Sequence, residues 1–466
     1  MKEGSSLITT EQLAPLAAAW APTQRWYAGK GREATMTIDP LADLAEHPPV
    51  TIWLLHVDYA DDEADTYQVP LVVRDEPVET LDHVLLGTVE TEAGTQWVYD
   101  ALHDKDVTPA WLVGIRDEIV DEPLRFVRYA EQPDDIPVDE PSLVLTGEQS
   151  NTSMVFGDVA ILKVYRRLHP GMNPDIEVQG ALTKLGAKHV PALLGAVEAN
   201  VAGEPSSLAM LQEFMTTASD GWELAKTSVR DLMAEADLHA DEAGGDFAGE
   251  AERLGDAVAS VHADLATAFG VREAAADELP ERVEAMEGRL RRAIGVVPEL
   301  ASVADALSAA YSELAELADS LAMQRIHGDL HLGQALRTVT RWVLIDFEGE
   351  PMAAMDARRE FDTPLRDVAG MLRSFDYAGY HRAMEAGWDP QLNYRAREWS
   401  ERNRDAFCSG YSLAAGHDPR EHHVLLRALE ADKAVYEAVY EARNRPAWLP
   451  IPLASLTRLA TDGETL

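Results

Sequence analysis

The stretch RIHGDLHLGQALRTVTRWVLIDFEGE, residues 325–350, decides the fold that the sequence predicts. Its run Trp342–Ile345 is short, apolar and rich in β-forming residues, so it predicts a strand that ends at Asp346. Asp329 precedes this strand in a loop, and Gln334 lies between the two acids. Two carboxylates and an amide at this spacing suit phosphoryl transfer, in which one carboxylate accepts the proton of an attacking hydroxyl.

The order of these residues is that of two kinase motifs. Protein kinases carry H-R-D-x-x-x-x-N followed by D-F-G, and this chain has H-G-D-x-x-x-x-Q from His327 to Gln334, then D-F-E from Asp346 to Glu348. Mg²⁺ prefers hard oxygen ligands, so we expect Asp329 as catalytic base and Asp346 with Gln334 as metal ligands. Glu348 replaces the usual glycine, and we expect it to contact either the metal or the acceptor. The alternative, that each aspartate merely forms a turn or caps a helix, is disfavoured by the two-part match.

A kinase also needs a lysine upstream. Residues 154–165 predict a hairpin with a Gly157-Asp158 turn, and Lys163 lies in its second strand. A buried ammonium is costly unless it meets an anion. ATP phosphates would supply that anion, and Glu177 of the following predicted helix would position the lysine. The alternative is a lysine on an edge strand that points to water.

Two further segments are candidates for nucleotide binding. The polar run from Thr146 to Ser153 lies where kinases have a glycine-rich loop, although it lacks that pattern and a plain turn is the alternative. The run 208–215 predicts a strand that continues into a connector, where a hinge would meet adenine; an ordinary sheet edge is the alternative. The candidate nucleotide-binding residues are Ser150, Asn151, Thr152, Ser153, Glu213, Phe214 and Met215.

A predicted helix at 430–443 has features of a sugar site. Tyr436 and Tyr440 are four residues apart, so they share a helix face, and we expect Asp432 and Arg443 on it as well. Aromatic rings, a carboxylate and an arginine together are typical of sugar recognition, whereas a tyrosine stripe can equally be core packing. Trp448, just after the helix, is a further stacking candidate.

Asp367 lies at the start of a helix predicted over 364–386. In kinase-like folds a carboxylate at this point accepts hydrogen bonds from the catalytic-loop backbone. We therefore predict that Asp367, together with His327 in the loop itself, supports that loop. A first-turn aspartate that merely favours the helix dipole is the alternative.

Composition restricts the class of protein. A length of 466 residues suits two to three packed units. The single cysteine, Cys408, excludes a disulfide framework, and no signal peptide or membrane span is recognisable, so we expect a cytoplasmic protein. A formal net charge of −41 argues against nucleic acid and anionic membranes as partners.

These patterns predict an α+β, bilobal, protein-kinase-like fold with a β-rich N-terminal cap and a mostly helical C-lobe. Helical periodicity is confined largely to the part after residue 216. The predicted divisions are a cap at 1–90, an intermediate segment and linker at 91–141, a kinase N-lobe with hinge at 142–215, and a helical C-lobe at 216–466 that holds the catalytic loop and the sugar site.

The chain resembles the actinobacterial maltokinase family, within the aminoglycoside-phosphotransferase and protein-kinase-like superfamily. The resemblance implies ATP- and Mg²⁺-dependent phosphorylation of maltose at its anomeric hydroxyl, giving maltose 1-phosphate for α-glucan or glycogen synthesis. It also implies a monomer, and a trehalose- or maltose-converting or glucan-synthesising enzyme is a candidate partner. The stretches that carry the resemblance include QRWYAGKGRE at 24–33, AILKVYRR at 160–167, RIHGDLHLGQ at 325–334 and DKAVYEAVYEARNRPAWLPIP at 432–452.

Two other functions stay open at this stage. A glucosamine kinase or other small-sugar kinase would share the fold and the catalytic motifs, and its amine substrate would want an extra carboxylate at the site. A catalytically dead kinase-like scaffold that binds a partner enzyme is the third hypothesis, and intact Asp329, Asp346 and Lys163 disfavour it.

Overall fold

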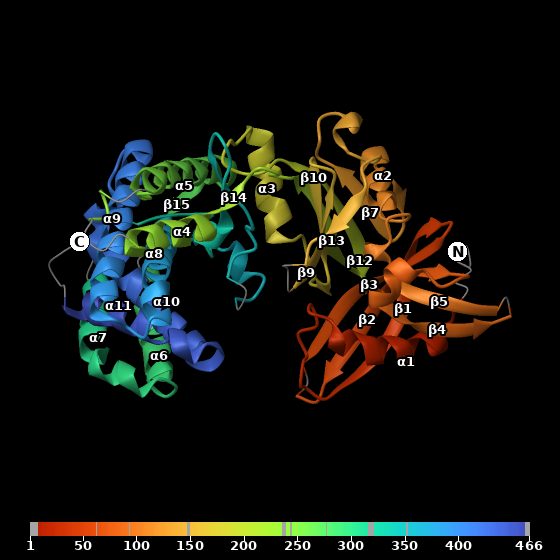
Figure 1. Cartoon of the computed structure of the whole chain (residues 1–466), viewed down its shortest axis with the longest axis horizontal. Coiled ribbons are helices and arrows are strands. Elements are labelled where there is room, and N and C mark those ends of the chain that lie inside the picture. The colour runs from red at the N-terminus through yellow and green to blue at the C-terminus, as the bar shows by residue number, and fades with distance from the viewer. Residues whose placement is uncertain are drawn as a thin grey trace. The chain divides into compact units, whose positions relative to one another are not determined.

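The computed structural model describes residues 8–61, 63–92, 94–146, 150–234, 239–242, 245–275, 277–315, 321–350 and 353–461. The chain divides into two compact units (Figure 1). Unit 1 comprises Met1–Gly180 and Pro191–Thr216, and unit 2 comprises Ala181–Val190 and Thr217–Leu466.

The first part of unit 1 is an antiparallel sheet with strand order β1-β2-β3-β5-β4, covered by helix α1. α1 (Thr10–Trp20) begins with a capping box between Thr9 and Gln12, which satisfies backbone groups at the helix start. Because β5 pairs with both β3 and β4, the sheet continues past the boundary predicted at residue 90, which falls inside β4. The strands are β1 (Ala34–Glu46), β2 (Pro49–Tyr59), β3 (Ala64–Arg74), β4 (Leu85–Thr91) and β5 (Gly94–Asp100).

The second part of unit 1 is a sheet of order β6-β7-β12-β13-β10-β9-β8, accompanied by α2 (Pro109–Asp117) and α3 (Pro174–Leu185). The predicted hairpin is present as β9 and β10, with Phe156 opposite Ala160. β6 and β7 come from the segment predicted as a linker, so that segment is part of this sheet. The strands are β6 (Val120–Asp121), β7 (Leu124–Arg128), β8 (Ser142–Val144), β9 (Asn151–Phe156), β10 (Ala160–Tyr165), β12 (Leu193–Val201) and β13 (Glu204–Glu213).

Arg166 joins the two sheets of unit 1. Its guanidinium forms an ion pair with Asp100 of β5 at 2.5 Å and donates to Thr152 Oγ1 of β9 at 2.8 Å. The same group lies 5.2 Å from the ring centroid of Trp26. Just after it, β11 (Arg167–Leu168) pairs with β3. A buried arginine is tolerated here because its charge is paired with a carboxylate and its Nε and Nη2 have hydrogen-bond partners.

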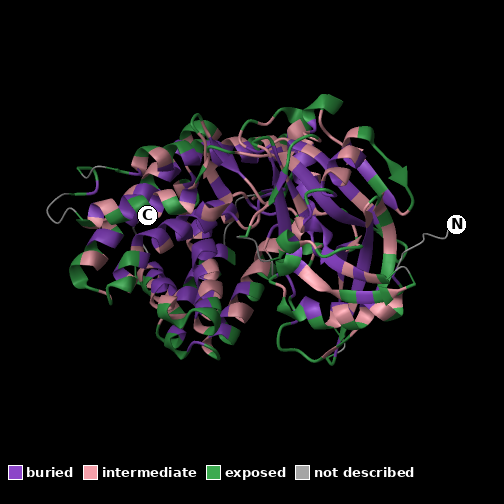
Figure 2. Ribbon diagram, turned by 45° about the vertical axis from the view of Figure 1, so that its right-hand side comes forward, coloured by how far each residue is buried: buried purple, intermediate pink, exposed green. Residues whose placement is uncertain are grey.

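Unit 2 is mainly helical, as the periodicity predicts, with buried faces turned inward (Figure 2). Its short strands are β14 (Ser219–Asp220), β17 (Ala335–Arg337) and β18 (Trp342–Leu344), which form one sheet, and β15 (Val271–Glu273) and β16 (Ala322–Gln324), which form another. The helices are α4 (Gly221–Ala234), α5 (Ala248–Phe269), α6 (Glu278–Ile294), α7 (Ala304–Ala315), α8 (Leu365–Glu385), α9 (Pro390–Ala415), α10 (His423–Asn444) and α11 (Pro450–Thr461).

Glycines allow two of these helices to pack closely. A Cβ added at Gly255 of α5 or at Gly410 of α9 would collide with the backbone of the other helix. Beside this pair, α8 is buried along most of its length. It is thus a rigid support for the residues that it carries. Among the helices in the described ranges, none has both the length and the apolar character that crossing a bilayer requires.

Candidate functional site

Helix α8 holds the loop that contains Asp329 through hydrogen bonds. Asp367, in the first turn of α8 and 1% exposed, accepts hydrogen bonds from the backbone N–H of His327 at 2.7 Å and of Gly328 at 2.9 Å. Gly328 has φ +86, a conformation that favours glycine. Asp367 would need hydrogen bonds of this kind in order to hold the loop in place. That Asp367 supports a catalytic loop stays a prediction.

Asp367 is itself held by a histidine to which the sequence assigned no function. His262 of α5 contacts the Asp367 carboxylate through Nε2 at 3.1 Å and Tyr411 Oη through Nδ1 at 3.0 Å. Burial acts to raise the pKa of Asp367, but hydrogen bonding and charge from His262 and His327, with the Gly328 N–H, outweigh it and lower that pKa. Asp367 is therefore an anion under the catalytic loop.

His327 connects the catalytic loop to the second motif. Its Nδ1 accepts from the backbone N–H of Asp329 at 3.3 Å, which leaves Nε2 to donate to the carbonyl of Ile345 at 2.9 Å. Its ring packs on Phe347, with centroids 4.7 Å apart. His327 thus couples the positions of Asp329 and of the segment that carries Asp346.

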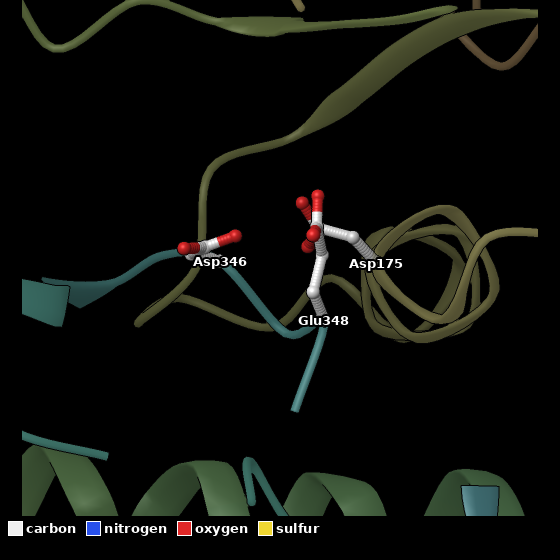
Figure 3. A group of neighbouring side chains, drawn as sticks. All are labelled: Asp175, Asp346 and Glu348. Atoms are coloured by element: carbon white, nitrogen blue, oxygen red, sulfur yellow. The ribbon is translucent and has the colours of Figure 1, made fainter. Parts of the chain in front are cut away.

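The predicted metal ligands of unit 2 lie together. Gln334, at the end of η6 (Leu332–Gln334), donates from Nε2 to Asp346 Oδ2 at 3.0 Å. Asp346 follows β18 with φ +68, a left-handed conformation that is uncommon for residues other than glycine. A carboxylate oxygen of Glu348 lies within 4.8 Å of one from Asp346. These oxygen donors fit a hard divalent cation, and Figure 3 shows Asp346 and Glu348 on one segment.

Lys163 occupies the middle of β10 in unit 1, opposite Met210 on one side and Ser153 on the other. Its Nζ lies 3.7 Å from Asp175 Oδ2, in the first turn of α3, and the side chain of Lys163 is 15% exposed. Asp175 is 2% exposed and is also labelled in Figure 3. The sequence assigned Asp175 only to the helix dipole and chose Glu177 as the partner, so this ion pair adds a carboxylate that the prediction missed.

Only some of the other residues predicted to bind the nucleotide lie where the sequence predicted them. Gly147, Glu148 and Gln149 of the predicted phosphate loop lie outside the described residues. Asn151, Thr152 and Ser153 are strand residues of β9, and the Thr152 hydroxyl accepts from Arg166, so its expected place in a loop is corrected. Ser150 is exposed just before β9. The predicted hinge residues Glu213, Phe214 and Met215 are half-buried at and after the end of β13.

A cavity of about 540 Å³ opens beside Asp329 in unit 2. Aromatic rings line much of it, and Tyr377 stacks on Trp448 with centroids 6.1 Å apart at 20°. Tyr436 also borders a larger cavity of about 1020 Å³ that shares Asp329. The aromatic residues of the smaller cavity are Trp222, Tyr377, Tyr436, Tyr440 and Trp448.

Two residues predicted to contact the sugar, Asp432 and Arg443, do not line the smaller cavity. Asp432 pairs with Arg289 of α6 at 2.6 Å and borders only the larger of these two cavities. Arg443 is exposed and is not among the residues lining either one. Arg445 lines the smaller cavity instead, with its guanidinium carbon 4.9 Å from the Trp448 ring and a 2.7 Å ion pair to Glu441. Arg443 is still within α10, which ends at Asn444, but the residues of α10 that line the smaller cavity are Lys433, Tyr436, Glu437, Tyr440 and Glu441.

Glu348, expected to contact either the metal or the acceptor, does not line either cavity beside Asp329. Its position next to Asp346 favours the metal alternative. The sequence missed several residues that do line the smaller cavity, because nothing in their local pattern marks them. They are Asp220, Trp222, Glu350, Tyr377, Lys433, Glu437, Glu441 and Arg445.

The order of the two units is that of a kinase-like phosphotransferase: a β-rich unit with Lys163, then a helical unit with Asp329 and Asp346. Residues 20–104 match the maltokinase N-terminal cap domain family. A glucosamine kinase from Streptacidiphilus jiangxiensis is 30% identical over 330 residues, which are 68% of this chain and 72% of that protein. One from Mycolicibacterium smegmatis is 32% identical over 329 residues, 69% of this chain and 80% of that protein.

A solved structure, a glucosamine kinase in complex with glucosamine, ADP and inorganic phosphate, has a TM-score of 0.69 to this chain. It is 25% identical, and the match covers 97% of this chain and all of that one. The chain therefore belongs to the sugar-kinase family of these glucosamine kinases, and its cap is of the maltokinase type. The predicted fold class and the predicted resemblance are confirmed.

Proposed function

We propose that this sugar kinase phosphorylates maltose at its anomeric hydroxyl, with ATP as donor and maltose 1-phosphate as product. The observation that carries the proposal is the aromatic lining of the cavity that runs from Asp329 to Trp448. Each glucosyl ring has an apolar face that packs on an aromatic ring. A disaccharide would use more of this lining than one sugar ring, and a volume of about 540 Å³ is in the range of small-ligand sites.

The reaction forms a bond between the acceptor oxygen and the γ-phosphorus of ATP, while the bond from that phosphorus to the β,γ-bridging oxygen breaks. Asp329 accepts a hydrogen bond from the hydroxyl and takes its proton as the new bond forms. Lys163, paired with Asp175 in the absence of nucleotide, would contact the α- and β-phosphates. Catalysis consists mainly of positioning and electrostatics.

Asp346, Gln334 and Glu348 are the residues that would hold Mg²⁺. The hydrogen bond from Gln334 to Asp346 sets the orientation of both side chains. When bound, Mg²⁺ supplies positive charge that offsets the charge on the phosphate oxygens. His327 maintains the spacing between this segment and the base through its contacts with Ile345 and Asp329.

Glucosamine is the second candidate acceptor, because the two curated relatives are named for it and the cavity has six carboxylates beside Lys433 and Arg445. Much of that negative charge is already balanced. Glu437 pairs with Arg373 at 2.7 Å, and Glu350 pairs with Arg366 at 2.9 Å. Burial also raises the pKa of Glu437. Less charge is thus left for a substrate ammonium group, which favours the neutral sugar.

The test is ATP consumption with maltose, glucosamine, glucose and an aminoglycoside, with NMR used to identify the phosphorylated carbon. We expect turnover with maltose and a phosphate on its anomeric carbon. Turnover with glucosamine alone would replace the proposal by the second candidate. No turnover with any sugar would favour the scaffold hypothesis, and Asp329→Asn measures the background of the assay.

A further inference from the structure

A lysine from α10 reaches the proposed catalytic base. Lys433 Nζ lies 3.2 Å from Asp329 Oδ1, although the two residues are 104 positions apart. The side chain of Lys433 is 30% exposed and that of Asp329 is 20% exposed. Lys433 borders both cavities beside Asp329, so it lies next to the position at which the acceptor hydroxyl would bind.

The charges that face Lys433 come from three segments. They are Asp329 and His331 in the catalytic loop, Glu350 after β18, and Glu437 one turn further along α10. The Tyr436 ring centroid is 5.4 Å from Nζ. Burial acts to lower the pKa of Lys433, but the three carboxylates outweigh it and raise that pKa. Lys433 is therefore an ammonium ion throughout the neutral range.

The loop from Asp329 to Gln334 has no lysine or arginine that could place a positive charge beside Asp329. Between Asp329 and Gln334 the sequence is Leu-His-Leu-Gly. Burial lowers the pKa of His331, so its imidazole is neutral at pH 7. Its Nδ1 is used to accept from the backbone N–H of Gly333 at 3.1 Å. The positive charge beside Asp329 is supplied from a different element, α10.

We propose that Lys433 is a positioning residue for the base: it orients the Asp329 carboxylate through Oδ1 before the acceptor binds. Oδ2 is then the atom that accepts the hydroxyl proton. The proposal rests on the proposed kinase activity, with Asp329 as base. When Asp329 takes the proton, Lys433 still faces the carboxylates of Glu350 and Glu437, which also pair with Arg366 and Arg373.

The ion pair also predicts the effect of removing Lys433. In Lys433→Met, Asp329 Oδ1 loses its ion-pair partner. The contact that fixes the orientation of the carboxylate is then missing. A misplaced catalytic group costs about 10²-fold in rate.

The experiment compares Lys433→Met, Lys433→Arg and wild type, with the sugar that wild type phosphorylates. In the Met variant we expect kcat to fall about 10- to 100-fold with the KM for the acceptor little changed. The Arg variant keeps the ion pair and recovers most of kcat. Lys105→Met, which removes an exposed lysine of unit 1, keeps the wild-type profile.

A rise in KM alone, with kcat unchanged, would show that Lys433 only binds substrate and would overturn the proposal. Thermal unfolding and nucleotide affinity establish that each variant is folded. If Met is not tolerated, the comparison of Lys433→Gln with Lys433→Arg decides. A carboxyl ¹³C titration of Asp329 in wild type and variant needs no acceptor, so it tests the ion pair even if the proposed kinase activity fails.

Discussion

The loop that contains the proposed base and α10, the helix proposed to bind the acceptor, meet at Asp329, but they are built in different ways. The loop is held by backbone N–H groups on a carboxylate that is 1% exposed, with a histidine and a tyrosine behind it. The acceptor side consists of side chains on a partly exposed helix. Tyr440 is 45% exposed, and the Arg445 side chain is 48% exposed.

The difference teaches which part of the site can vary. Loop geometry rests on buried charged hydrogen bonds, and losing one partner of such a bond is expensive. Half-exposed rings and ion pairs each contribute less and can be exchanged singly. This is the physical reason that one fold can keep its phosphoryl chemistry while the acceptor changes. Substitutions under the loop should therefore have larger effects than substitutions on the acceptor side.

Asp329→Asn is expected to have the largest effect. The amide keeps the shape but cannot take the hydroxyl proton, and a positioned general base contributes about 10²- to 10⁴-fold. We expect turnover to fall by that order while nucleotide affinity stays near that of wild type. Calorimetry with ATP and a coupled assay measure the two quantities. Near-normal turnover would refute the base assignment.

Asp367→Asn tests the buried side of the comparison. It replaces an anion that accepts from two loop N–H groups and His262, so we expect a loss of about 1–3 kcal/mol in the free energy of unfolding together with slower turnover. Because folding lowers the pKa of Asp367, its contribution is complete above the unfolded value of about 3.9 and is lost as pH falls through the lower folded value.

Denaturant unfolding of wild type and Asp367→Asn between pH 7 and pH 3 measures this effect. The difference between them should be constant above about pH 5 and shrink below about pH 4. Asp256→Asn, which changes an exposed carboxylate of α5, is the control and should show little difference. A difference that grows in acid would mean that Asp367 is not held as an anion.

The same contrast explains which features the sequence could predict. The H-G-D and D-F-E motifs are local, so the spacing alone predicts Gln334 and Asp346 as members of one group, and the two side chains are hydrogen-bonded. The hairpin with Lys163 and most helices of unit 2 are predictable from turn residues and periodicity. These features depend on neighbours in the chain.

Features that depend on distant partners could not be predicted. Strand β5 was assigned outside the cap sheet because its partners, β3 and β4, are set by pairing rather than by pattern. The Thr152 hydroxyl accepts a hydrogen bond from Arg166. This contact depends on how the two sheets of unit 1 meet, which the sequence pattern does not show. Lys433 lies in the helix predicted to carry the sugar contacts, yet no periodicity relates it to Asp329. Helix spacing chose Arg443, which lies in α10, whereas the cavity-lining Arg445 follows the end of the helix at Asn444 and could not be found from helix spacing.

Trp448→Ala tests the aromatic lining of the smaller cavity. The ring stacks on Tyr377 and borders the cavity, and loss of an aromatic contact of this kind is worth about 3- to 10-fold in binding. We expect the KM for the acceptor to rise by that factor with kcat little changed. Trp388→Ala is the matched control, since Trp388 also packs on a tyrosine but does not line either cavity beside Asp329.

We expect the smallest effect from substitutions of the two arginines near the end of α10, and the two substitutions should differ. Arg445 lies over the rings of Tyr440 and Trp448 and pairs with Glu441, whereas Arg443 is exposed. A half-exposed cation–π contact is worth only about 2- to 5-fold, so we expect Arg445→Ala to raise the acceptor KM by about that factor and Arg443→Ala to leave it unchanged. The pair loses the same side chain from positions two apart, so general effects on charge cancel. If Arg443→Ala had the larger effect, the helix face expected from the sequence would describe the sugar site better than the cavity does.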